Sequence, residues 1–195
     1  MGFLDKLFGL APAPAPVEPE IRVEDLVLPK LRKGYLVDFD DRTWEVVAQA
    51  RVESAERSEG GQRWMEDEWS LRSADASVRL RRRDMHGVVE WELLSPLRLD
   101  EVDLEIRDAL VRDGAPGAQG FFEDQPVFRD YMAGAALYHR VGQAEADGTF
   151  FWNYNDDLHR PVLRVEQQGN AIATVSLLTP VEEYQFNNIL PGAAR

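Results

Sequence analysis

Cysteine is absent from the 195 residues of the chain. This absence excludes disulfides, thiolate metal sites and cysteine nucleophiles, and it is typical of a protein from a reducing compartment. Long apolar runs are also absent, since no stretch reaches the roughly 18 residues that a membrane-spanning helix needs. The N-terminus lacks the basic region and long apolar core of a signal peptide. We therefore expect a cytoplasmic protein.

Basic residues are scarce relative to acidic ones. The chain has 22 Lys and Arg against 35 Asp and Glu, and its net charge is −13. A surface of this charge repels phosphate backbones, so we expect no nucleic-acid partner. The expected partners are basic, cationic or apolar.

Histidine occurs three times in the chain, as His86, His139 and His159. None is spaced from another as metal ligands are, and no serine lies in a nucleophile-elbow pattern. The nearest approach to a reactive or metal site is His159 behind Asp156 and Asp157, which an ordinary surface turn explains as well. The sequence therefore predicts no catalytic residue, no metal and no cofactor. An enzyme or metal-binding protein that uses this acidic turn is the alternative.

The segment 34–94 holds four of the five tryptophans and reads as four or five short strands. Asp40-Asp41 favours a tight turn between the first two strands. Apolar residues then occupy alternate positions, as on one face of a half-buried strand, at Trp44, Val46, Ala48 and Ala50. Trp69 and Leu71 share a face in a later strand. The pattern predicts an antiparallel meander.

The segment 127–178 repeats this pattern of short strands and turns. The sequence thus predicts a mainly β protein made of two small antiparallel meander modules, 21–99 and 100–195, packed as a barrel-like or sandwich pair. One combined domain is the alternative. At most two short helices are expected besides the N-terminal one.

Two segments of the second half leave helix as an option. Residues 100–114 either form a helix that Asp100 caps and Gly114 ends, or begin as a strand. The helical option places on one side Val102, Ile106, Ala109 and Leu110. Residues 184–191 are expected to close the chain as a short helix or turn.

The first twenty residues read as an amphipathic helix followed by a tether. A helix over residues 1–10 places on one side Phe3, Leu4, Leu7, Phe8 and Leu10. Alternating prolines in 11–20 forbid helix and stiffen the chain into a spacer. We expect residues 1–10 to recruit the protein to a protein partner or an oligomeric assembly. Peripheral association with the inner membrane, and packing of the segment on its own domain, are the alternatives.

Carboxylates and indole rings lie close together in residues 64–69. Because ring faces and anions both favour positive charge, the segment predicts a surface for a cation or another ligand. The residues of this predicted surface are Trp64, Glu66, Glu68 and Trp69. The alternative interpretation is core tryptophans alternating with solvated acids. The one basic run, Arg79 and 81–83, is interpreted as the solvated face of a strand.

Short motifs in the chain resemble a bacterial family, domain of unknown function 4178. They are Gly34 with Asp38, the run RTWEV at 42–46, and Trp64 with Glu68-Trp69. The similarity is strongest over 33–71, and the later segments 150–154, 163–166 and 186–191 resemble the second half of the family. The resemblance implies a small β-rich module without established activity, often encoded near membrane-stress and envelope proteins, and it implies no catalytic residue. The expected function is a non-catalytic binding or adaptor module.

Overall fold

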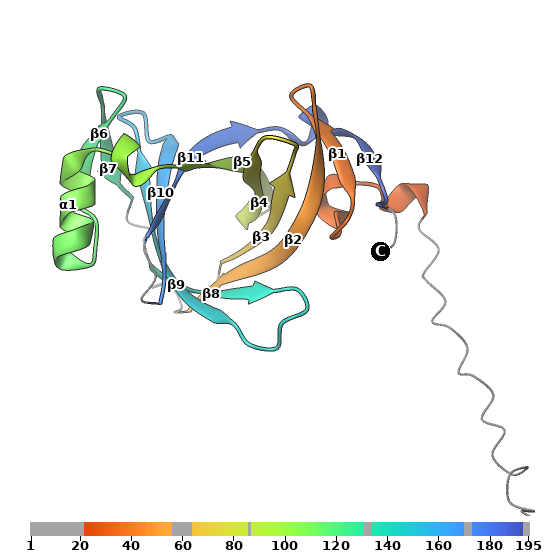
Figure 1. Cartoon of the computed structure of the whole chain (residues 1–195), viewed down its shortest axis with the longest axis horizontal. Helices are drawn as coiled ribbons and strands as arrows, with labels where there is room; N and C mark the ends of the chain where they lie inside the picture. The colour runs from red at the N-terminus through yellow and green to blue at the C-terminus, as the bar shows by residue number, and fades with distance from the viewer. Residues whose placement is uncertain (1–21, 56–63, 86, 131–133, 170–172, 193–195) are drawn as a thin grey trace, which may run out of the picture.

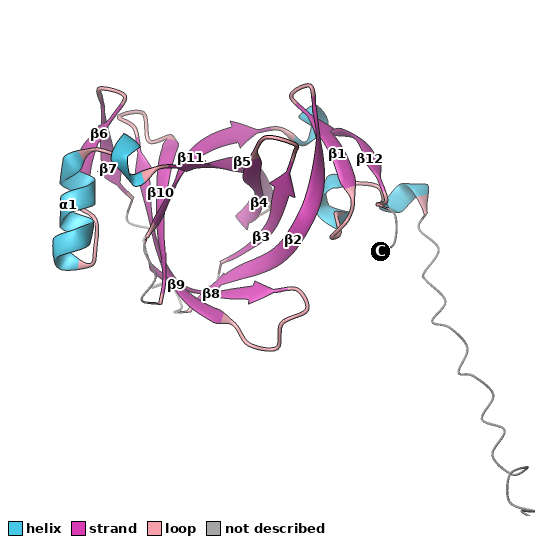
Figure 2. Ribbon diagram, in the orientation of Figure 1, coloured by secondary structure: helices cyan, strands magenta, loops and turns pink. Residues whose placement is uncertain are grey.

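The computed structural model describes residues 22–55, 64–85, 87–130, 134–169 and 173–192. These residues are mainly β (Figure 2). The strands are β1 (Leu36–Phe39), β2 (Arg42–Ser54), β3 (Met65–Arg72), β4 (Ser77–Met85), β5 (Val88–Leu97), β6 (Gln119–Phe122), β7 (Gln125–Arg129), β8 (Gly134–Arg140), β9 (Asp147–Asn155), β10 (Pro161–Gln168), β11 (Thr174–Val181) and β12 (Asn187–Leu190). The helix predicted for residues 1–10 lies outside the described residues.

Helices are few and short in the described part of the chain. There is one α-helix, α1 (Leu104–Asp113), and the 3-10 helices are η1 (Val23–Asp25), η2 (Leu28–Lys30), η3 (Leu99–Glu101) and η4 (Glu183–Gln185). No helix among the described residues is long and apolar enough to cross a membrane.

Eight strands close an antiparallel barrel in the order β2, β3, β4, β5, β11, β10, β9, β8, because β8 pairs with β9 on one side and with β2 on the other. The meander β2–β5 comes from the first half of the chain and β8–β11 from the second. The halves join where β5 pairs with β11 and where β2 pairs with β8. The prediction of a mainly β, barrel-like fold is confirmed, and strands from both predicted modules build this one barrel.

Four further strands flank the barrel. The hairpin predicted at Asp40-Asp41 joins β1 to β2, and both aspartates have positive φ, 50° and 57°, as a two-residue hairpin turn requires. Strand β12 pairs with β1, so the expectation of a closing helix or turn at the C-terminal end is wrong for Asn187–Leu190. The hairpin of β6 and β7 attaches to β9.

The outer face of the barrel is apolar and is covered on two sides. One cluster joins β2–β5 to β1, to β12 and to the turn residues 28–31, and its largest side chains are Trp44, Trp69 and Trp91. A second cluster joins β9–β11 to α1 and β7 through Ile106, Val127, Leu163 and Val175. Figure 1 shows the ring of strands nearly end-on, with α1 on one side and β1 and β12 on the opposite side.

The helix option for the segment after β5 is confirmed. The four residues predicted for its apolar side are buried. Its N-cap, however, is Asp103, whose carboxylate accepts a hydrogen bond from the backbone N–H of Glu105. Asp100 instead lies in η3 and pairs with Arg98. Gly114 ends the helix with a left-handed φ of 68°, which glycine adopts without strain.

Candidate functional site

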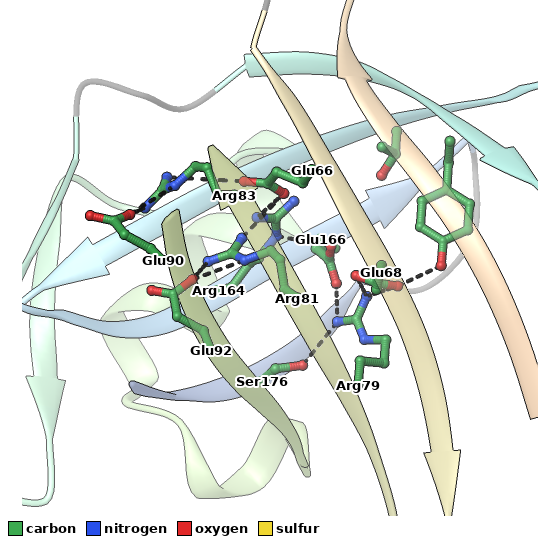
Figure 3. Close-up of polar contacts among 12 residues, drawn as sticks. Glu66, Glu68, Arg79, Arg81, Arg83, Glu90, Glu92, Arg164, Glu166 and Ser176 are labelled. Carbon is green, nitrogen blue, oxygen red and sulfur yellow. Dashed lines mark hydrogen bonds and ion pairs between the residues drawn. The ribbon is translucent and has the colours of Figure 1, made fainter. Parts of the chain in front are cut away.

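The inner face of the barrel carries charged side chains in register. On β3, β4 and β5, Glu68 lies opposite Arg81, and Arg81 lies opposite Glu92. One step along the same strands, Glu66 lies opposite Arg83. Directly paired residues share a face of the sheet, and these positions alternate with the apolar residues of the outer cluster. The charges therefore point into the barrel, as Figure 3 shows.

A bulge in β2 contributes to this arrangement. The register of β2 against β3 shifts between Val46 and Ala48, so Val47 is the extra residue. Trp44 and Val46 consequently lie in the outer cluster, whereas Ala50 packs in a separate cluster with Tyr138 and Phe151. The prediction that Trp44 to Ala50 share one face is therefore wrong.

Two buried arginines hold the centre of the interior. Arg81 donates to Oε2 of Glu92 through Nε at 2.9 Å and to Oε2 of Glu66 through Nη1 at 3.4 Å. Arg164, from β10, donates to the same Glu66 oxygen at 3.2 Å and to Oε1 of Glu166 at 2.9 Å. Both arginines are almost inaccessible to solvent: the exposed fraction is 1% for Arg81 and 0% for Arg164. Each arginine is thus fixed by two carboxylates (Figure 3).

The network continues toward one end of the barrel through Arg79. This arginine pairs with Glu68 at 3.3 Å, pairs with Glu166 and donates to Oγ of Ser176 at 3.2 Å. The hydroxyl of Tyr138, on β8, donates to Oε1 of Glu68. Side chains from six strands, β3, β4, β5, β8, β10 and β11, are therefore connected across the interior.

The ionisation of the network follows from burial and pairing. Burial raises the pKa of the Glu68 carboxyl, against the attraction of Arg79, and the neighbouring Glu166 raises it further. For Arg81, burial works to lower the pKa, but Glu66 and Glu92 outweigh it and the pKa is raised. Arg81 therefore stays charged, and Glu68 takes up a proton more readily than an exposed glutamate does.

Pockets open at both ends of this network. The first, here called the Asn153 pocket, has a volume of about 350 Å³, and its lining includes Arg81, Arg83, Glu90, Glu92, Asn153, Pro161 and Pro180. The second, here called the Ser176 pocket, has about 580 Å³, and its lining includes Arg79, Pro96, Tyr138, Glu166, Gln168 and Ser176. The residues that line the two pockets come from opposite ends of β4, β5, β10 and β11, so the pockets lie at opposite ends of the barrel.

The predicted ligand surface is divided between the two faces of β3. Glu66 and Glu68 point into the barrel and are buried, so their interpretation as solvated acids is wrong. Trp69 lies in the outer cluster and donates from Nε1 to the backbone oxygen of Leu31 at 3.0 Å. Trp64 packs edge-on against Phe151, with ring centroids 5.2 Å apart. The structure thus brings the two glutamates together but not the two tryptophans.

The basic run is also divided. Arg81 is buried inside the barrel, and Arg79 and Arg83 share its inward face, so the interpretation of the run as a solvated face is wrong for these three residues. Sequence reasoning missed Glu92, which pairs with Arg81, and it also missed Arg164 and Glu166, which pair with each other. The available signal was the alternation of these charges with Leu163, Val165 and Leu93, which is equally typical of a strand with one face in solvent.

The carboxylate of Asp156 in the acidic turn accepts hydrogen bonds from within the same turn. Asp156 accepts hydrogen bonds from the backbone N–H groups of Leu158 and Arg160 at 2.9 and 2.8 Å, and from the Arg160 side chain. The backbone bond from Arg160, above all, lowers the pKa of this carboxyl despite some desolvation. His159 has a positive φ of 61° at the same turn. Within the described ranges, no three His, Asp or Glu side chains are grouped so that they could hold a metal ion.

The five apolar residues predicted to bind a partner lie outside the described residues, so the docking role of the N-terminal segment stays a prediction.

Comparison with protein families found a match over residues 32–183 to the sequence model of a family described as Domain of unknown function (DUF4178). This range contains all eight strands of the barrel. Comparisons with curated proteins and with solved structures gave no match.

Proposed function

Since the chain belongs to the DUF4178 family, whose matched region contains the whole barrel, we propose that it is a non-catalytic binding module that receives a small polar ligand in the barrel. One observation carries the proposal: pockets at both barrel ends have floors made of buried charges that the protein already holds in place. An eight-stranded barrel is wide enough to hold one small ligand.

The fixed charges favour binding for an energetic reason. Ordering a flexible side chain on binding costs about 0.5 to 1.5 kcal/mol. Arg81 and Arg164 are already ordered by two carboxylates each, and Arg164 also lies over the ring of Phe151 at 4.4 Å. A ligand that contacts the network therefore meets groups whose positions change little. Such an arrangement favours selectivity for polar groups of one geometry.

The alternative of an enzyme or metal-binding protein at the acidic turn has less support. The Asp156 carboxylate is used by its own turn, and its release would leave two backbone N–H groups without their acceptor. Recruitment to a partner assembly through residues 1–10 remains part of the proposal and rests on the sequence alone.

A ligand screen tests the binding role. The purified full-length chain is titrated with a panel of amines, guanidines, sugars, alcohols and carboxylates, and binding is followed by thermal shift and calorimetry. At least one compound should bind with a Kd of about 1 mM or better, which corresponds to roughly −4 kcal/mol. Its affinity should fall at least roughly tenfold in Asn153→Ala or in Ser176→Ala, a loss of about 1.4 kcal/mol.

The matched control is Glu45→Gln, which removes the exposed pair between Glu45 and Arg72, neither of which lines the two pockets, and it should leave the affinity unchanged. A panel without a binder would contradict the proposal. Binding that both pocket variants leave intact would contradict it as well.

A further inference from the structure

The Asn153 pocket contains a buried hydrogen-bond acceptor that no described residue satisfies. Asn153 points inward from β9, opposite Arg164, and is 4% exposed. Its side-chain oxygen, Oδ1, has no hydrogen-bond partner among the described residues. A buried acceptor without a donor costs about 1 to 3 kcal/mol, so the site favours a ligand that donates a hydrogen bond.

Two carboxylates at the same pocket also have acceptor capacity left. Arg81 donates to Oε2 of Glu92 through both Nε and Nη2. Arg83 likewise donates to Oε2 of Glu90 through both Nε and Nη2. These arginines therefore leave Oε1 of each glutamate to another donor. Asn153 and these two glutamates therefore offer acceptor oxygens to a ligand in the pocket.

The charges that line the pocket favour a cation. Four carboxylates, Glu90, Glu92, Asp130 and Glu182, line it together with two arginines. Both arginines are engaged by carboxylates, Arg81 by Glu66 and Glu92 and Arg83 by Glu90. An anionic ligand would have to compete for guanidinium groups that are already paired with carboxylates, and it would approach the carboxylates of Glu90, Glu92 and Glu182.

The pocket also has apolar walls, including Val89, Pro161 and Pro180, that suit a short alkyl group. We propose that the Asn153 pocket binds a small organic cation that donates N–H hydrogen bonds, an alkylammonium or alkylguanidinium compound. This inference rests on the proposed function and names its ligand class. The N–H groups bond to Oδ1 of Asn153 and to Oε1 of Glu90 or Glu92, and the alkyl chain contacts the proline walls.

A matched series of probes tests the inference on the full-length chain. Butylammonium and butylguanidinium are compared with butyltrimethylammonium, which keeps the charge but has no N–H group, with butanol, which is neutral, and with butyrate, which is an anion. Binding is measured by chemical-shift titration of the labelled protein, including the side-chain amide of Asn153. The first two probes should bind at least tenfold more tightly than the other three.

Three variants locate the site. Asn153→Leu should weaken butylammonium binding about tenfold, because it removes the acceptor, whereas Asn153→Asp should retain the binding, because it restores an acceptor oxygen. Glu90→Gln should weaken the binding as well. This residue is half exposed, so its variant stays folded even where Asn153→Leu does not. Ser176→Ala, at the other end of the barrel, is the matched control and should have no effect.

Equal binding of butylammonium and butyrate would overturn the inference, and so would full retention of affinity in both Asn153→Leu and Glu90→Gln. The proposed function fails separately. If the cations do not bind but another compound binds and is weakened by Ser176→Ala, only the assignment of the ligand class to the Asn153 pocket falls. If no compound of either set binds, both proposals fall.

Discussion

The inner and outer faces of this barrel are filled in opposite ways. The outer face presents Trp69, Trp91 and Leu163 to covering segments that bury them completely or nearly so. The inner face presents a small apolar cluster around Phe151 and a larger set of arginines and glutamates. Of these charged residues, Arg81 and Arg164 are as well buried as the tryptophans. The comparison shows that burial alone does not tell which face of a strand stabilises the fold.

The two kinds of burial differ in energy. Burial of a large apolar side chain contributes about 1.5 to 3 kcal/mol. A buried ion pair contributes little net stability, because desolvation of the two charges offsets most of their attraction. We infer that the outer clusters hold the fold together and that the inner network sets the shape and charge of the pockets. Substitutions on each face test this division.

The largest effect is expected on the outer face. Trp69→Ala should lower the free energy of unfolding by about 4 kcal/mol, because it removes the stacked contact with Trp91 and leaves a cavity that the covering segments cannot fill. Denaturation in urea measures the loss. Glu45→Gln, which removes an exposed pair, is the control and should cost less than about 1 kcal/mol. A loss below 1 kcal/mol for Trp69→Ala would contradict the assignment of the outer cluster as the stabilising core.

A somewhat smaller effect is expected inside. Arg81→Met should cost about 3 kcal/mol, because Glu92 and Glu66 would then lose a buried cation. Adding Glu92→Leu to this variant should recover most of the loss, because the uncompensated carboxylate is removed. The same urea measurement compares the two variants. A double variant no more stable than Arg81→Met would show that the pair itself, and not its imbalance, carries the energy.

Much of the fold could be predicted from local pattern. Alternating apolar positions and the turn at Asp40-Asp41 correctly indicated the antiparallel meander, and the apolar side of α1 was visible in Ile106 and Leu110. The strand β12 was missed because Asn187–Leu190 is too short to show a period and depends on pairing with β1. Closure of the barrel was predicted only as an option, because β2 pairs with β8 across about 85 residues of sequence, and no local signal specifies such a contact.

The site was less predictable, for a specific physical reason. Alternation shows that a strand has two different faces, and charged residues on one face normally indicate solvent. Here the charged face is enclosed, because Glu66 on β3 meets Arg164 on β10, and this partnership exists only after the barrel has closed. The bulge at Val47 adds to the difficulty, since one extra residue reverses the faces of the rest of β2. Glu66 and Glu68 could be selected from the sequence, but their partners could not.

The smallest expected effect is a pH dependence of stability that an inner-face residue contributes and an outer-face residue does not. Burial raises the pKa of Glu68 in the folded protein above the ordinary value of 4.5, so the folded state holds this proton more tightly than the unfolded state does. The contribution of Glu68 to stability is therefore fully present below the unfolded pKa and is lost as the pH rises through the folded pKa. The groups that face Glu68 are Arg79 and Arg81 on β4, Glu166 on β10 and Tyr138 on β8.

Glu68→Gln removes this titration while it keeps an oxygen that can accept from the Tyr138 hydroxyl. The stability of the variant relative to the natural chain should therefore increase as the pH rises from about 4.5 to neutrality. Urea denaturation of both proteins across this range gives the difference at each pH. Trp69→Ala serves as the control. Tryptophan does not titrate, so the stability that this variant loses relative to the natural chain should stay nearly constant with pH. A difference between Glu68→Gln and the natural chain that shrinks or stays flat as the pH rises would show that Arg79 keeps Glu68 ionised despite its burial.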